Sequence, residues 1–80
     1  MNKSSSDIQQ FIVDWITGHR GFAEHDIDVS ADIFAEGYVD SLSMFRLILE
    51  IENYLETEVD QNYLFEQERL SIVSISSLLG

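Results

Sequence analysis

The sequence predicts an all-α protein, a small four-helix bundle with a long loop between its first two helices and a short third helix. Apolar residues recur at helical spacing in several segments, and a polar capping residue precedes each of them. No segment alternates between apolar and polar residues for long enough to form a strand. The 80-residue length allows one domain, whose single core stabilises the fold by roughly 3–5 kcal/mol.

The first helix is predicted from one apolar stripe with helical spacing. The stripe consists of Ile8, Phe11, Ile12, Trp15 and Ile16. A Ser-Ser-Ser-Asp stretch before it supplies capping side chains, and we expect Gly18 and Gly21 to end the helix. Because Trp15 lies on the stripe, its side chain should be largely buried.

The segment from Phe22 to Asp40 has no sustained apolar period, although apolar residues return throughout it. This pattern predicts a long loop that is held against the core. Because loops of this length are uncommon in compact domains, we expect a short helical turn within it, near Ala31 to Ala35.

The second long helix is predicted from about Ser41 to Leu55, with Asp40 as its N-cap. Its apolar residues form two stripes, separated by about a third of the helix circumference. One stripe consists of Leu47, Ile48, Ile51 and Leu55, and the other of Leu42, Phe45 and Leu49. One stripe is sufficient for a core, so the second needs another explanation.

Two shorter helices are predicted in the last third of the chain. Asp60 is the expected cap of a short third helix that carries Tyr63, Leu64 and Phe65. Ser71 is the expected cap of the last helix, which carries Ile72, Ile75, Leu78 and Leu79.

Fifteen acidic residues against four Lys and Arg give the chain a formal net charge of -11. This charge repels nucleic acid and anionic lipid and disfavours self-association, so we expect a monomer with basic partners that binds neither nucleic acid nor membrane. A hydrophobic content of 45% still predicts a folded chain. No apolar run is long enough for a signal peptide or a membrane span, which favours a cytoplasmic location. Since cysteine is absent, any thiol chemistry must be imported.

The most informative segment leads into the second helix and reads Glu36-Gly37-Tyr38-Val39-Asp40-Ser41-Leu42. Taken alone, Asp40 and Ser41 are explained as ordinary helix-capping residues. A phosphodiester on Ser41 would also be stabilised at this position, because the first turn of a helix presents free N–H groups and the positive end of the helix dipole.

Together with Leu-Ile-Leu-Glu-Ile-Glu-Asn at 47–53, this segment resembles the attachment site of the acyl carrier protein superfamily, which includes the peptidyl (aminoacyl) carriers. The resemblance implies a single carrier domain over residues 1–80, of which we expect residues 1–6 to be flexible. It implies that Ser41 receives a 4'-phosphopantetheine arm from coenzyme A and then carries acyl or aminoacyl groups as thioesters. Asp40 matches the residue that helps to position the metal-bound coenzyme A during this modification.

The same resemblance gives the second stripe a use, because Leu42, Phe45 and Leu49 would border the arm and contact partner enzymes. Burial against the long loop is the alternative, and the two are most evenly balanced for Leu49. Arg46, a further candidate for partner contact, departs from the acidic residue that many fatty-acid-type carriers have at this place. The resemblance therefore points to polyketide, nonribosomal peptide or D-alanyl biosynthesis, with a fatty-acid-type carrier as the alternative. The implied partners are a phosphopantetheinyl transferase, an adenylating or acyltransferase loading enzyme, and downstream synthase enzymes.

Two rival classes of function fit the residues less well. An acidic interaction module or nucleic-acid mimic would bind a basic groove by charge alone and would use Ser41 only as a cap. An enzyme would need a nucleophile with a base, but His19 and His25 accompany no glycine-flanked serine, so we expect no catalysis by the chain itself. We also expect no metal site: one acidic stretch mimics an EF-hand loop, but Ala31 replaces its glycine and Gly37 its glutamate.

Overall fold

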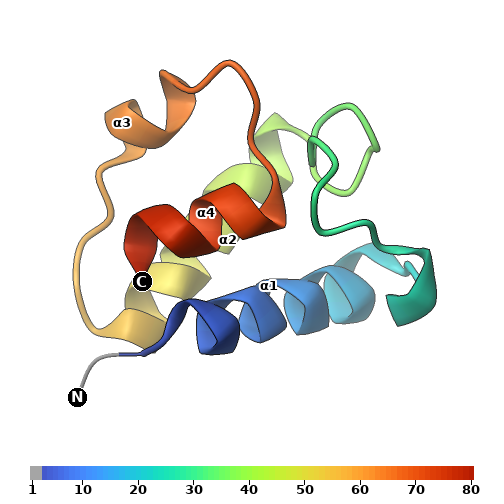
Figure 1. Cartoon of the computed structure of the whole chain (residues 1–80), viewed down its shortest axis with the longest axis horizontal. Helices are drawn as coiled ribbons and strands as arrows, with labels where there is room; N and C mark the ends of the chain where they lie inside the picture. The colour runs from blue at the N-terminus through green and yellow to red at the C-terminus, as the bar shows by residue number, and fades with distance from the viewer. Residues whose placement is uncertain (1–2) are drawn as a thin grey trace.

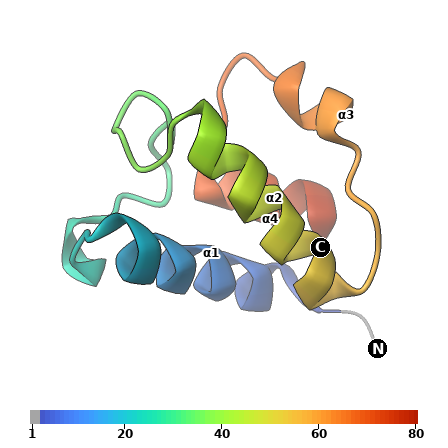
Figure 2. The same cartoon turned by 180° about the vertical axis from the view of Figure 1, so that it is seen from behind.

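The computed structural model describes residues 3–80, and over this range it consists of α-helices and one 3-10 helix. The α-helices are α1 (Ser5–Arg20), α2 (Ser41–Leu55), α3 (Gln61–Phe65) and α4 (Ile72–Leu79), and the 3-10 helix is η1 (Glu24–Asp26). In both cartoon views α2 and α4 lie above α1, and α3 lies on the side of this pair away from α1 (Figures 1 and 2). No helix within residues 3–80 is both long and apolar enough to cross a membrane. The predicted all-α bundle with a long first loop and a short third helix is confirmed.

The helix α1 is closed at each end by a local capping contact. The Ser4 hydroxyl accepts the N–H of Asp7 over 3.1 Å, and the Asp7 carboxylate accepts the N–H of Ser4 over 3.3 Å. Gly21 ends the helix in the left-handed conformation, with a φ of 78°. The expectation that Gly18 also helps to end the helix is wrong, because Gly18 lies inside α1. A single glycine costs a helix only about 1 kcal/mol relative to alanine, so the helix continues through it.

We expected residues 1–6 to be flexible, and the structure describes only the later residues of this segment. Residues 1 and 2 lie outside the part of the chain that the structure describes. Ser4 is the N-cap of α1, and the next two serines form the first turn. The helix therefore begins before its apolar stripe, because the capping contacts of Ser4 fix the backbone there.

The long loop between α1 and α2 is held on the core by Tyr38. Its side chain is buried, with 2% of the residue exposed, and its ring packs edge-on against Phe22 with the centroids 5.1 Å apart. Its hydroxyl accepts the N–H of Asp28 over 2.7 Å and donates to the carbonyl of Asp26 over 3.3 Å. The loop is pinned to the core, as its returning apolar residues predicted.

The long loop contains a 3-10 helix and, further along, a single helical turn. The 3-10 helix is η1, at Glu24–Asp26, and the helical turn lies near Ala31 to Ala35, as we expected: the N–H of Glu36 donates to the carbonyl of Asp32 over 3.0 Å. Asp32 starts this turn by accepting two backbone N–H groups, each over 2.9 Å. Gly37, with a φ of 73°, ends it after a single turn, so no longer helix can develop.

Asp32 also joins the loop to the segment that precedes α4. Its Oδ2 accepts the N–H of Leu70 over 3.1 Å, and the N–H of Ile33 donates to the Leu70 carbonyl over 2.8 Å. Backbone donors, first the N–H of Ala35, together with the charge of Arg69 hold the pKa of Asp32 below its usual range. The ionised carboxylate therefore links two segments that are distant in the sequence.

The other α-helices begin directly after the residues that the sequence predicted as caps. The carboxylates of Asp40 and Asp60 and the hydroxyl of Ser71 accept the N–H of the third helical residue, over 2.8, 3.1 and 3.0 Å respectively. The range of α2 is the predicted one. Each of the four α-helices within residues 3–80 is thus capped by the side chain of the residue that precedes it.

The core lies where α1 packs against α4 and α2. It takes one face of each long helix together with apolar residues from the loops. The buried residues are Ile8, Ile12, Val13, Trp15, Ile16, Ile33, Tyr38, Val39, Met44, Leu47, Ile48, Ile51, Val59, Leu64, Leu70, Ile72 and Ile75. The expected burial of Trp15 is confirmed, and its ring stacks against His19 with the centroids 4.7 Å apart.

The two faces of α2 should respond differently to truncation. We expect Ile48→Val to lower the free energy of unfolding by about 0.5–1.5 kcal/mol, because it removes a methyl group from a fully buried side chain. Leu49→Ala, at the next residue but on the exposed face, should change it by less than about 0.5 kcal/mol. Urea denaturation followed by circular dichroism measures both, and equal losses would contradict this division of the helix.

Candidate functional site

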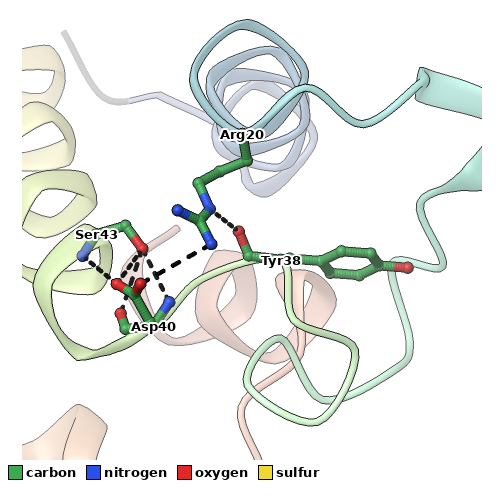
Figure 3. Close-up of polar contacts among 4 residues, drawn as sticks. All are labelled: Arg20, Tyr38, Asp40 and Ser43. Carbon is green, nitrogen blue, oxygen red and sulfur yellow. Dashed lines mark hydrogen bonds and ion pairs between the residues drawn. The ribbon is translucent and has the colours of Figure 1, made fainter.

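The start of α2 is organised by a reciprocal contact between Asp40 and Ser43 (Figure 3). Asp40 Oδ1 accepts both the N–H and the hydroxyl of Ser43, each over 2.8 Å. In return, the Asp40 N–H donates to the Ser43 Oγ over 2.8 Å. The two side chains form a capping box that fixes the backbone around Ser41. The sequence predicted the role of Asp40 but not that of Ser43.

Ser41 is the first residue of α2, and it is exposed. Its neighbour Asp40 bonds to Ser43, so the capping box does not use the Ser41 hydroxyl. Within residues 3–80, the N–H groups of Ser41 and Leu42 donate to no backbone acceptor. Free N–H groups and the positive end of the helix dipole suit a phosphate attached here, so the residues present fit a phosphodiester on Ser41.

A third residue, Arg20, reaches this helix start from the end of α1. Its Nε donates to the carbonyl of Tyr38 over 3.0 Å, and its Nη2 lies 3.9 Å from Asp40 Oδ2. Figure 3 shows the guanidinium between the backbone that enters α2 and the capping carboxylate. Sequence reasoning missed Arg20, because the contact joins residues on opposite sides of a long aperiodic loop.

The carboxylate of Asp40 is held in its ionised form. The N–H of Ser43, then the hydroxyl of Ser43 and, to a smaller extent, the charge of Arg20 keep the pKa of Asp40 below its usual range. The side chain is nevertheless 65% exposed. Asp40 therefore places an exposed negative charge next to Ser41.

The second apolar stripe of α2 faces solvent. Leu42 is 75% exposed, Leu49 62% and Phe45 48%, so these side chains are not buried against the long loop. The ring of Phe45 lies 6.0 Å from that of Phe65 in α3, measured between centroids. We call Leu42, Phe45, Leu49 and Phe65 the apolar surface of α2 and α3. An exposed apolar surface of this kind is typical of a site for partner contact.

Arg46 and Phe65 are also exposed, on α2 and α3 respectively. Arg46 lies on α2 one turn beyond Leu42, and it is exposed. Phe65 is half-exposed, and sequence reasoning missed it as a surface residue. The sequence did contain a signal for this exposure, because three consecutive apolar residues of a helix cannot all face the protein core. In α3 only Leu64 is buried.

The two histidines are engaged away from Ser41. His19 Nδ1 lies 3.0 Å from the carbonyl of Trp15, to whose ring it is stacked. His25 Nε2 lies 3.5 Å from Asp26 Oδ1 on the exposed 3-10 helix. Over residues 3–80 no cluster of three or more metal-ligating side chains is formed. The structure thus brings Ser41 together with Asp40, Ser43 and Arg20, and with no histidine.

Comparison with known families gives this geometry its context. Residues 20–74, well over half of the chain, match the family model described as the phosphopantetheine attachment site. The chain therefore belongs to this family, the acyl and peptidyl carrier proteins, whose members carry a covalently attached 4'-phosphopantetheine and are not themselves enzymes. No curated protein and no solved structure matches the chain.

The cap of α2 makes a pH-dependent contribution to stability. We expect Asp40→Ala to melt several degrees below the wild type at pH 7, because it removes the acceptor of both Ser43 donors. The folded-state pKa is lowered, so this stabilisation is complete above the value of an unfolded aspartate, about 3.9, and is lost as the pH falls through the lower folded-state value. The difference in melting temperature should therefore narrow below pH of about 4.

Thermal melts followed by circular dichroism across this pH range test the expectation. Glu50→Ala is the matched control, since it removes one exposed carboxylate from the same helix. It should alter the melting temperature little at any pH. A constant difference between Asp40→Ala and the wild type at all pH values would contradict the assigned role of the carboxylate.

Proposed function

We propose that the Ser41 hydroxyl receives 4'-phosphopantetheine from coenzyme A and that the chain then carries acyl or aminoacyl groups. The observation that carries the proposal is the position of Ser41, an exposed serine at the first residue of a helix inside the segment that matches the family. The free N–H groups of Ser41 and Leu42 supply the donors that a phosphodiester needs.

The chemistry at Ser41 is an exchange of phosphate esters. The serine oxygen forms a bond to the phosphorus next to the pantetheine, the pyrophosphate bond of coenzyme A breaks, and the adenosine bisphosphate leaves. The serine proton passes to a base of the separate transferase, since His19 and His25 are engaged elsewhere. Asp40, exposed and ionised, is placed to contact the metal-bound coenzyme A on the transferase.

The attached arm supplies a terminal thiol that holds the carried group as a thioester. The chain has no cysteine of its own, so this thiol is the single one available. A flexible arm raises the local concentration of the carried group at each enzyme that docks. The chain itself contributes the attachment point and the surface by which those enzymes recognise it.

We assign partner contact to Leu42, Phe45, Leu49 and Arg46. Their exposure, and the position of Leu42 next to Ser41, support this assignment. The docking enzymes include the phosphopantetheinyl transferase, an adenylating or acyltransferase loading enzyme and downstream synthase enzymes. Since the chain has a net charge of -11, these partners should present basic surfaces around an apolar contact.

The pathway that we favour is polyketide, nonribosomal peptide or D-alanyl biosynthesis. Arg46 places a positive charge on the exposed face of α2, which disfavours partners built to recognise an acidic residue there. A fatty-acid-type carrier is the alternative. Incubation of the modified protein with candidate adenylating enzymes and with acyltransferases distinguishes these pathways, because the loading enzyme chooses the carried group. The cytoplasmic location stays a prediction.

Attachment at Ser41 is tested by mass spectrometry after incubation with coenzyme A, magnesium and a broad-specificity phosphopantetheinyl transferase. The wild type should gain the mass of one phosphopantetheinyl group, and Ser41→Ala should gain none. Ser43→Ala is the matched control in the same turn, and it should still be modified, although its weakened cap should slow the reaction. Modification of Ser41→Ala, or none of the wild type, would overturn the proposal.

The role of the exposed stripe is tested at Leu42. We expect Leu42→Ala to lower kcat/KM for modification by roughly tenfold, because truncating one of the few side chains that anchor an interface costs more than about 1 kcal/mol. Its melting temperature should stay close to that of the wild type, since the side chain is 75% exposed. A large loss of stability would instead place Leu42 in the folding core. Leu47→Ala is the control for such a loss of stability, because Leu47 is buried in the same helix.

A further inference from the structure

Arg20 holds two groups of the α2 start at the same time. Its Nε donates to the Tyr38 carbonyl over 3.0 Å, and its Nη2 faces Asp40 Oδ2 at 3.9 Å (Figure 3). A guanidinium presents its donors in a rigid planar fork, whereas an ammonium is a compact point charge. The backbone that enters α2 and the carboxylate that caps it are therefore tied to one side chain of α1.

The two oxygens of the Asp40 carboxylate have different neighbours, and Arg20 lies beside one of them. Oδ1 is occupied by the N–H and the hydroxyl of Ser43, so Oδ2 is the oxygen that remains. Arg20 attracts Oδ2, but 3.9 Å is too long for a hydrogen bond. Oδ2 thus lies beside the charge of Arg20 and keeps its capacity to accept a donor or a cation from a partner.

Charge gives Arg20 a second effect. The chain contains four Lys and Arg against fifteen Asp and Glu, and Arg20 forms the ion pair to Asp40. A phosphodiester on Ser41 would place a further negative charge next to that carboxylate. Like charges a few ångströms apart repel each other, and a cation beside them offsets the repulsion.

We propose that Arg20 is a positioning residue for the modification of Ser41, an inference that rests on the proposed function. It fixes Asp40 and the backbone from Tyr38 to Asp40 in the geometry that presents Ser41 to the transferase. It also offsets the charge of Asp40 as the phosphodiester forms. Arg20 acts through Asp40 and the backbone, and it takes no part in bond making.

The test compares Arg20→Gln and Arg20→Lys with the wild type, using full-length protein, coenzyme A, magnesium and a broad-specificity phosphopantetheinyl transferase. Arg20→Gln should lower kcat/KM by roughly tenfold, mainly through kcat, because displaced reacting groups lose rate more than affinity. Arg20→Lys should fall between, since it keeps the charge and loses the fork. In the unmodified protein, the pKa of Asp40, followed by carbon NMR of its carboxyl group, should rise in Arg20→Gln.

Arg69→Gln is the matched control. Arg69 also donates to a loop carbonyl, that of Ser30 over 2.9 Å, and its loss changes the net charge equally. We expect kcat/KM within about twofold of the wild type, and no change in the pKa of Asp40, because Arg69 makes no contact at the α2 start. Equal losses in Arg20→Gln and Arg69→Gln would show that only net charge matters, and would overturn the proposal.

The remaining outcomes are also decisive. A loss confined to KM would assign Arg20 to docking with the transferase and contradict a positioning role. If circular dichroism shows that Arg20→Gln does not fold, Arg20→Lys decides, and a wild-type kcat/KM there would overturn the proposal. A wild type that gains no arm would refute the proposed function itself. A modified wild type with an equally fast Arg20→Gln would refute the inference about Arg20 alone.

Discussion

The burial of Tyr38 is the constraint on which the rest of this structure depends. A buried phenol must find hydrogen-bond partners, and Tyr38 finds them in the backbone of Asp26 and Asp28. Its carbonyl binds Arg20, so the same residue joins the loop to the end of α1. Only Val39, which is also buried, separates Tyr38 from the cap of α2. The position of the helix start is therefore set by core packing, although the site itself is exposed.

Periodic and capped segments were predictable from the sequence. The bounds of α2 follow from a strong apolar period and an aspartate before it, and each predicted cap has its expected backbone partner. Gly18 shows the limit of single-residue signals, because the actual helix end depends on which glycine adopts a positive φ. The position of η1 could not be predicted either, because a helix of three residues is too short to show an apolar period.

Contacts across the loop could not be predicted at all. Arg20 and Tyr38 are 18 residues apart, and nothing in either segment marks the other as a partner. The role of Ser43 was harder to predict, because the third helical residue of a capping box is more commonly glutamate than serine. The residues of the site that lie on α2 were thus accessible from the sequence, whereas the residue supplied by α1 was not.

The two faces of α2 separate stability from recognition. Leu47, Ile48 and Ile51 are buried, and the exposed stripe of Leu42, Phe45 and Leu49 contributes little to the core. Exposed side chains can change without unfolding the domain, so partner preference can diverge while the fold stays the same. The contact between Phe45 and Phe65 extends this freedom to α3, which has a single buried residue.

The arrangement of the chain ends has a practical meaning. Gly80 lies against Ser5, close enough that a Cβ on Gly80 would come within 2.9 Å of it. In both cartoon views the last turn of α2 lies near this meeting point, and the start of α2 lies at the other end of that helix (Figures 1 and 2). A linker, tag or neighbouring module joined at residue 80 thus begins away from the end of α2 that carries Ser41. The domain can be tethered to another polypeptide or to a solid support while that serine stays open to solvent.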